Sequence, residues 1–216
     1  MKIRRLFLDT AGAVGPLLAG SEIAARWDEP SVLTGMTVGA LAGHLARAVS
    51  TVAGYLASDG PVSDAPSLDA AGYFASIDGL GGRDVDIDAP LHRAIRRRSE
   101  EAAAGGAAEV LGRWDATVQE LAALLPVEPD DRMVAVLDGR AMRLDDYLVT
   151  RLVEMIVHGD DLAVSLGITP PQMPEDAADA VIGMLVDMAR RRHGDLAVVR
   201  ALTRRERDEI QALRVL

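Results

Sequence analysis

Residues 147–166 carry the side chains whose types and spacing could do chemistry. Polar residues recur there at steps of three and four, which places them in one column along a helix. The rest of the segment is apolar around nearly the whole circumference, as is typical of a helix in a protein interior. Buried polar groups need partners, so we expect the column to line an internal pocket or a slit that reaches solvent. Its members are Tyr147, Arg151, Glu154, His158 and Asp161.

Glu154 and His158 are the pair in this column that could share a metal ion, because residues four apart on a helix can point to one locus. His44 lies on the shoulder of the apolar face of another predicted helix and could supply a second imidazole. Two imidazoles and one carboxylate suit a divalent zinc, nickel or iron ion and leave a position open for water or substrate. The spacing alone leaves two plainer interpretations open, a Glu–His helix pair and a hydrogen-bonded core histidine.

Two arginines lie one helical turn from these candidates. Arg47 follows His44 and Arg151 precedes Glu154, so either guanidinium could hold a substrate carboxylate. We prefer a surface charge for Arg47 and an ion pair with Glu154 for Arg151. The two remaining histidines fall in arginine-rich segments that we expect to be exposed turns and not ligand sites. They are His92 and His193.

The composition indicates one globular domain with a helical core. Of the 216 residues, 49% are hydrophobic and 26% charged, whereas only 3% are aromatic. Leu, Val, Ile, Met and Ala must therefore build the core, which favours helices. The net charge of −10 argues against nucleic-acid binding, and no apolar run is long enough to span a membrane. Because there is no cysteine, a thiolate ligand is excluded and any thiol must come from outside. We expect a cytoplasmic protein.

Helical periodicity dominates the pattern along the chain. Residues 133–144 instead have a period of two around Asp138–Gly139 and predict a β-hairpin, because Asp-Gly suits a two-residue turn. Residues 58–90 are rich in Asp, Gly, Pro and Ser and predict a long crossover with one short helix. The pattern therefore predicts an all-α fold, a helical bundle with a small hairpin. Helices are predicted at residues 7–27, with a bend near Pro16, 38–57, 70–80, 91–125, weakened at Gly105–Gly106, 147–166, 174–192 and 196–213.

Two segments carry a resemblance to a known family. Residues 30–56, PSVLTGMTVGALAGHLARAVSTVAGYL, place a histidine in the second long helix. Residues 147–167, YLVTRLVEMIVHGDDLAVSLG, supply Glu-x-x-x-His-x-x-Asp after the hairpin. Together they resemble the DinB-like superfamily, and within it the N-terminal domain of mycothiol-dependent maleylpyruvate isomerase and its actinobacterial relatives. The tail at residues 184–207 is similar to that branch as well.

The resemblance implies a DinB-like four-helix bundle with a long crossover. We expect a single metal-binding domain over all 216 residues, with a helical extension at about residues 174–216. By resemblance the metal ligands are His44, Glu154 and His158. Asp161 would lie close to the metal, where it either holds an imidazole or is a solvated acid at the helix end. The resemblance also implies zinc, with nickel or iron as alternatives, and mycothiol or a similar thiol as cosubstrate.

Two features depart from the family pattern. Met36 stands where the family usually has a tryptophan before the second helix. The isomerase also has a second domain that contributes an arginine to the active site, and we expect no room for that domain in this chain. The resemblance therefore supports the metal assignment without implying maleylpyruvate isomerisation.

The leading hypothesis is a divalent-metal bundle that uses a low-molecular-weight thiol as a transferase or isomerase of a small electrophile. Metal-dependent hydrolysis and a non-catalytic metal- or ligand-binding module are the alternatives, and no residue is assigned a catalytic role. The expected partners are a small thiol and a small electrophile, without nucleic acid or membrane. A homodimer is an oligomeric state that the sequence leaves open.

Overall fold

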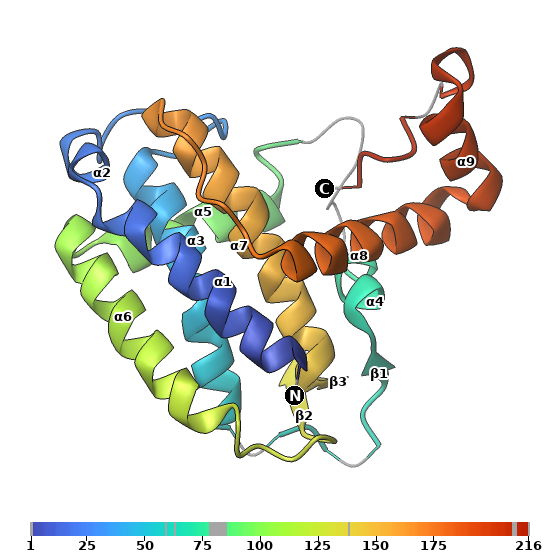
Figure 1. Ribbon diagram of the computed structural model, residues 1–216, viewed down its shortest axis with the longest axis horizontal. Coiled ribbons are helices and arrows are strands. Elements are labelled where there is room, and N and C mark those ends of the chain that lie inside the picture. The colour runs from blue at the N-terminus through green and yellow to red at the C-terminus, as the bar shows by residue number, and fades with distance from the viewer. Residues whose placement is uncertain are drawn as a thin grey trace.

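Four long helices enclose the core of the computed structural model (Figure 1). They are α1 (Lys2–Ala19), α3 (Val38–Leu56), α6 (Gly106–Leu124) and α7 (Leu144–Leu166). Because α1 and α3 each pack against both α6 and α7, the four helices close into a bundle. The structure describes residues 2–58, 60–62, 64–77, 86–137, 139–208 and 211–215.

Capping residues explain where two of these helices begin and end. Thr37 caps the start of α3, since its hydroxyl accepts a hydrogen bond from Ala40 N at 3.0 Å. Helix α7 stops at Gly167, whose φ of 70° is a left-handed conformation that glycine adopts without strain. The amide of Ile168 then donates to the carbonyl of Ala163 at 3.0 Å, as in a Schellman motif. The ends of the two helices that carry the candidate site are therefore fixed locally.

Most of helix α7 is buried, as its apolar pattern predicts. Its fully buried apolar side chains include Leu148, Leu152, Met155 and Leu162. The apolar surround is incomplete, however, because Val164 near the end of the helix is 55% exposed. In the polar column Tyr147 and Arg151 are buried. The remaining members, Glu154, His158 and Asp161, are half-buried. The column therefore runs from the core toward solvent.

The predicted hairpin is present. Strand β2 (Met133–Val136) pairs antiparallel with β3 (Arg140–Arg143). The turn differs from the prediction, because the pairing of Val136 with Arg140 leaves three residues, 137–139, between the strands instead of two. Gly139 has a φ of 86°, the left-handed conformation typical of the last residue of a three-residue hairpin loop. Asp138 lies outside the described residues.

A third strand joins the hairpin from the crossover. Strand β1 (Ser67–Leu68) pairs parallel with β3, which gives the strand order β1-β3-β2. Two residues are too few to show an alternating pattern, so the sequence could not predict this strand. The short helix expected at residues 70–80 is α4 (Ala70–Ala75), and residues 78–80 lie outside the described part of the chain.

Two segments that were each predicted as a single helix are divided into two helices. The first helix begins at Lys2 and ends at Ala19, and a separate short helix, α2 (Ser21–Ala25), follows it. Pro16 lies inside α1 without ending it. The single helix expected at residues 91–125 is two helices, α5 (Pro90–Ala103) and α6. Gly106 separates them because its φ of 79° lies in the left-handed region.

The C-terminal helices lie on one side of the bundle, beside α4, at the right of Figure 1. Helix α8 (Glu175–His193) contacts α1, α4 and α7, and α9 (Asp195–Thr203) packs on α8. Helix α9 is shorter than the helix predicted at residues 196–213. A 3-10 turn, η1 (Arg205–Arg207), follows it. Among the described helices, none has the length and apolar character needed to cross a membrane.

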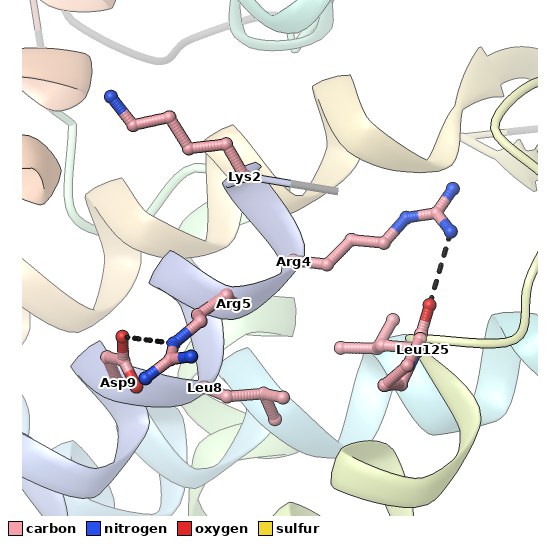
Figure 2. A pocket seen from close by; sticks show the side chains of 7 residues that line it. Lys2, Arg4, Arg5, Leu8, Asp9 and Leu125 are labelled. Carbon is pink, nitrogen blue, oxygen red and sulfur yellow. Dashed lines mark hydrogen bonds and ion pairs between the residues drawn. The ribbon is translucent and has the colours of Figure 1, made fainter.

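A buried arginine links the start of α1 to the C-terminal end of α6 by hydrogen bonds. Arg4 is 3% exposed, and its Nε donates to Asp145 Oδ1 at 2.7 Å. Its terminal nitrogens donate to three backbone carbonyls at and after the end of α6, those of Leu125, Glu128 and Pro129. Figure 2 shows Arg4 and Leu125 in the wall of a surface pocket of about 470 Å³. No histidine lines this pocket, so it is separate from the candidate site.

Candidate metal centre

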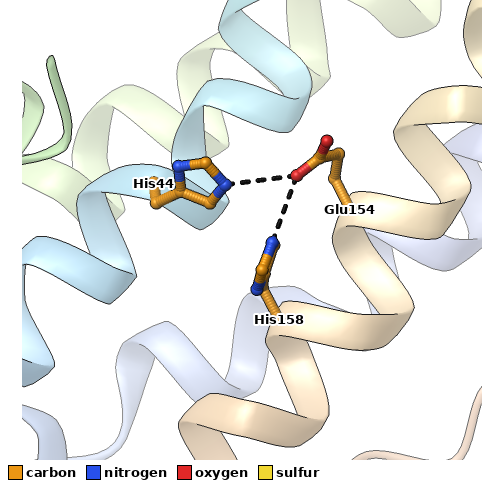
Figure 3. A group of neighbouring side chains, drawn as sticks. All are labelled: His44, Glu154 and His158. Atoms are coloured by element: carbon orange, nitrogen blue, oxygen red, sulfur yellow. Dashed lines mark hydrogen bonds and ion pairs between the residues drawn. The ribbon is translucent and has the colours of Figure 1, made fainter. Parts of the chain in front are cut away.

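The candidate site lies where α3 and α7 pack side by side (Figure 3). His44 projects from α3, and Glu154 and His158 project toward it from α7. His44 Nε2 lies 3.2 Å from Glu154 Oε2, and His158 Nε2 lies 3.3 Å from the same oxygen. The two imidazole rings stand edge to face with their centroids 4.6 Å apart. The structure thus brings together the three residues predicted as ligands.

A serine on α5 orients His44. Ser99 is buried on α5, and its hydroxyl donates to the carbonyl of Ile95 at 2.8 Å. Since a hydroxyl has one hydrogen, Ser99 Oγ accepts from Nδ1–H of His44, 3.2 Å away. This hydrogen bond selects the tautomer in which His44 Nε2 carries a lone pair and faces Glu154.

The contact between Ser99 and His44 depends on a glycine. A Cβ atom at Gly43 would lie 2.4 Å from the carbonyl oxygen of Ser99 and 2.9 Å from Ala103 N. Both of these atoms belong to the backbone of α5, which cannot move aside as a flexible side chain does. Helix α5 therefore comes close enough to orient His44 only because position 43 has no side chain.

Asp161 orients the second imidazole. Its Oδ2 accepts from His158 Nδ1–H at 2.9 Å, and this bond directs Nε2 of His158 toward Glu154. A carboxylate on the far nitrogen is the usual support of a metal-binding histidine. Of the two interpretations that the sequence left open, the structure shows Asp161 as the imidazole partner. The adjacent Asp160 is exposed, as expected for a surface residue.

The donor set suits a divalent ion. One ligand atom from each of His44, Glu154 and His158 lies within 4.8 Å of the others. Ligands about 2.0–2.1 Å from a tetrahedral zinc ion lie about 3.3 Å from each other, which matches the 3.2 and 3.3 Å separations around Glu154 Oε2. An unprotonated imidazole nitrogen and a carboxylate oxygen repel at such a distance unless a proton or a cation lies between them. The residues fit a metal ion, and that they bind one stays a prediction.

The pKa values of all three groups depart from their ordinary values. Burial lowers the pKa of His44 below its ordinary 6.5 and outweighs the effect of the nearby Glu154 carboxylate, so this imidazole is neutral at pH 7. Burial would also lower the pKa of His158, but its hydrogen bonds to Asp161 and Glu154 raise it to about 9. Burial would raise the pKa of Glu154, yet the hydrogen bond from His158, the nearby His44 and the charge of Arg151 hold it well below its usual range.

Two tyrosines enclose Arg151 one turn before Glu154. The guanidinium carbon lies 4.7 Å from the ring centroid of Tyr147 and 5.5 Å from that of Tyr73. Its Nη2 lies 3.6 Å from Glu154 Oε1, so the expected ion pair forms. Tyr73 and Ser99 are the residues near the site that the sequence reasoning missed. Tyr73 lies on α4 in the crossover and Ser99 on α5, and no periodic pattern relates either residue to the column.

The other candidates lie outside the three-residue cluster. Arg47 is half-buried on α3 and has no ion pair or side-chain hydrogen bond among the described residues. His92 lies within α5 and His193 at the end of α8, and both are half-buried, so the prediction of exposed turns is wrong. Neither histidine joins a group of possible ligands in the described part of the chain.

Comparison with known proteins identifies the family. The family model of the mycothiol maleylpyruvate isomerase N-terminal domain matches residues 9–163. The chain belongs to this family. A solved structure of mycothiol-dependent maleylpyruvate isomerase, in a variant with one histidine replaced by alanine, has a TM-score of 0.53 and 14% identity to the chain. This similarity covers 87% of our chain and 68% of the other one. A comparison with curated proteins gives no match.

The mycothiol maleylpyruvate isomerase N-terminal domain match spans most of α1 to α7, and all three cluster residues lie inside it. At 14% identity the solved structure shows the fold alone, which is DinB-like. The family and the DinB-like helical bundle predicted from the sequence are therefore confirmed. The roles of the site residues stay predictions.

Proposed function

We propose that this domain binds a divalent metal ion through His44, Glu154 and His158. With a small thiol as cosubstrate, it then acts as a transferase or an isomerase on a small electrophile. The observation that carries the proposal is the convergence of two oriented imidazoles and one carboxylate oxygen at separations suited to a metal ion. The thiol is supported by the similar solved protein, which is described as mycothiol-dependent. We propose zinc as the metal, with nickel or iron as alternatives.

The chain's own residues prepare the site for this chemistry. Ser99 and Asp161 occupy the Nδ1 atoms of the two histidines, so both Nε2 atoms point at one locus. Glu154 is ionised at neutral pH because its pKa is held low. A metal ion bound there would supply what the chain lacks, the stabilisation of a thiolate at neutral pH. Since the sequence contains no cysteine, the thiol must belong to a cosubstrate.

Thiol binding to the metal-loaded protein tests the proposal. Calorimetric titration with mycothiol, and with N-acetylcysteine as a simpler thiol, should give heats that vary with the ionisation enthalpy of the buffer. The reason is that a thiol which binds as a thiolate releases its proton. His158→Ala should lose both the binding and the proton release, whereas Asp160→Ala, an exposed position on the same helix, should keep both.

The same titration separates the alternatives. Metal-loaded protein that binds neither thiol from neutral to mildly alkaline pH would rule out thiol transfer and favour metal-dependent hydrolysis. Purified protein that holds no metal would favour a non-catalytic binding module. That the whole chain forms one domain stays a prediction, and the homodimer stays untested.

A further inference from the structure

Arg151 has hydrogen-bond donors that the protein does not use. Its side chain is buried, at 7% exposure, and its Nε donates to Thr150 Oγ1 at 3.0 Å. Neither terminal nitrogen reaches an acceptor among the described residues. Among the described residues, the side-chain nitrogen that lacks both a hydrogen bond and contact with solvent belongs to Arg132. The two terminal nitrogens of Arg151 therefore touch solvent. Free donors on a buried guanidinium are a place where an anion binds.

The surroundings of Arg151 determine where such an anion would lie. The rings of Tyr147 and Tyr73 hold the guanidinium in place. Its Nη2 lies 3.6 Å from Oε1 of Glu154, whereas the two imidazoles contact Oε2. An anion on the free donors would therefore lie directly beside the candidate metal ligands.

Arg47 supplies a second cation on the facing helix. It lies one turn after His44 and has no ion pair among the described residues. Burial lowers the pKa of Arg47, and the positive charges of Arg98 and Arg151 lower it further, so these guanidinium groups repel one another. An anion between them would relieve this repulsion.

Two hydrogen bonds connect the backbone of Arg47 to Tyr147, whose ring packs on the guanidinium of Arg151. The hydroxyl of Tyr147 donates to Thr51 Oγ1 at 2.9 Å, and Thr51 Oγ1 donates to the carbonyl of Arg47 at 2.7 Å. The backbone of α3 at Arg47 and the aromatic support of Arg151 on α7 are therefore linked. These bonds fix the backbone at Arg47 relative to the ring that supports Arg151, and the charge of Arg151 acts on the guanidinium of Arg47.

We propose that Arg47 and Arg151 form a subsite that binds a carboxylate of the electrophile beside the metal ligands. The planar fork of a guanidinium matches a carboxylate through two parallel hydrogen bonds. Among the described residues Arg47 has no ion pair and Arg151 pairs with Glu154 alone, so this group of arginines is a local exception in a chain with a net charge of −10 and attracts an anion. The proposal rests on the proposed function for the identity of the occupant, whereas carboxylate binding itself is measurable without turnover.

Succinate, a simple dicarboxylate, is the probe for this subsite. Because a carboxylate can also bind a metal ion, the calorimetric titration uses both the protein as purified and the chelator-treated protein. Succinate should bind to both forms, and the neutral succinamide to neither. Arg47→Gln should weaken succinate binding by about 10-fold or more. Arg97→Gln, whose side chain on α5 is 72% exposed, should change it by less than about twofold.

A second variant separates geometry from charge. Arg151→Lys keeps the charge but loses the planar fork, so it should weaken succinate binding without changing metal content or circular dichroism. Equal weakening by Arg47→Gln and Arg97→Gln, or tighter binding of inorganic phosphate than of succinate, would overturn the subsite. That failure would leave thiol binding by the same variants intact. Failure of the proposed function would instead appear as loss of thiol binding in the wild type.

Discussion

The proton on His158 determines how the cluster responds to pH. Hydrogen bonds to Asp161 and Glu154 raise its pKa from 6.5 to about 9 in the folded protein. A group whose pKa is higher in the folded than in the unfolded protein contributes its full stabilisation of the fold when the pH is below its unfolded-state pKa. This contribution is lost as the pH rises through the folded-state pKa. The free energy of unfolding of chelator-treated protein should therefore fall between pH 6.5 and about pH 9.

Asp161→Asn should move this loss of stability to lower pH. An amide does not favour the imidazolium form, so the pKa of His158 falls when the carboxylate is replaced. Urea unfolding at a series of pH values measures the shift. Asp160→Asn removes an exposed carboxylate from the same helix and is the control. A shift of equal size in the control would show that general charge, and not the bond to His158, is responsible.

The sequence predicted the candidate ligands better than the residues that orient them. Glu154 and His158 are visible because their spacing is a property of the helix that carries both. His44 needed the family resemblance, since it lies on a different helix. Ser99 and Tyr73 could not be predicted, because their approach depends on how α5 packs on α3 and how α4 packs on α7.

At the scale of elements, the close packing of α5 on α3 supports the site. Gly43→Ala places a methyl group against the backbone of α5. We expect it to lower the free energy of unfolding by about 1–3 kcal/mol, because an overpacked contact forces the helices apart. The separation should also break the hydrogen bond from His44 to Ser99.

Gly54→Ala on the same helix is the matched control. Apart from the neighbouring backbone of α3 itself, no atom of the described residues lies within 4 Å of a Cβ built at Gly54, so alanine should stabilise α3 by roughly 0.5–1 kcal/mol. Urea unfolding of both variants measures the contrast. Stabilisation by both substitutions would mean that α5 does not depend on the bare backbone at Gly43.

Elements with a long period were predictable, and short or irregular ones were not. The apolar pattern predicted α3, α7 and the hairpin, because each repeats over many residues or ends at a strong turn signal. Strand β1 has two residues and exists only through its partner β3. The break at Gly106 depends on a left-handed φ, which a single glycine allows but does not require.

At the scale of the whole molecule, Arg4 connects distant parts of the chain. It joins α1 to Asp145 of α7 and to the backbone that follows α6. Arg4→Met leaves buried carbonyls without a donor and should lower the free energy of unfolding by about 3–5 kcal/mol. Arg5→Met, the neighbouring exposed position in Figure 2, should change it by about 0.5 kcal/mol or less. Similar effects of the two substitutions in thermal unfolding would contradict a connecting role for Arg4.

Metal analysis of protein purified without chelator and without nickel resin tests the central claim most directly. We expect about one divalent ion per chain in the wild type and in Asp160→Ala, since three ligands and an open position hold a single ion. His44→Ala, Glu154→Ala and His158→Ala should each retain only a small fraction of that metal. Wild-type protein without a bound divalent ion, or alanine variants that keep as much metal as the wild type, would contradict the assignment.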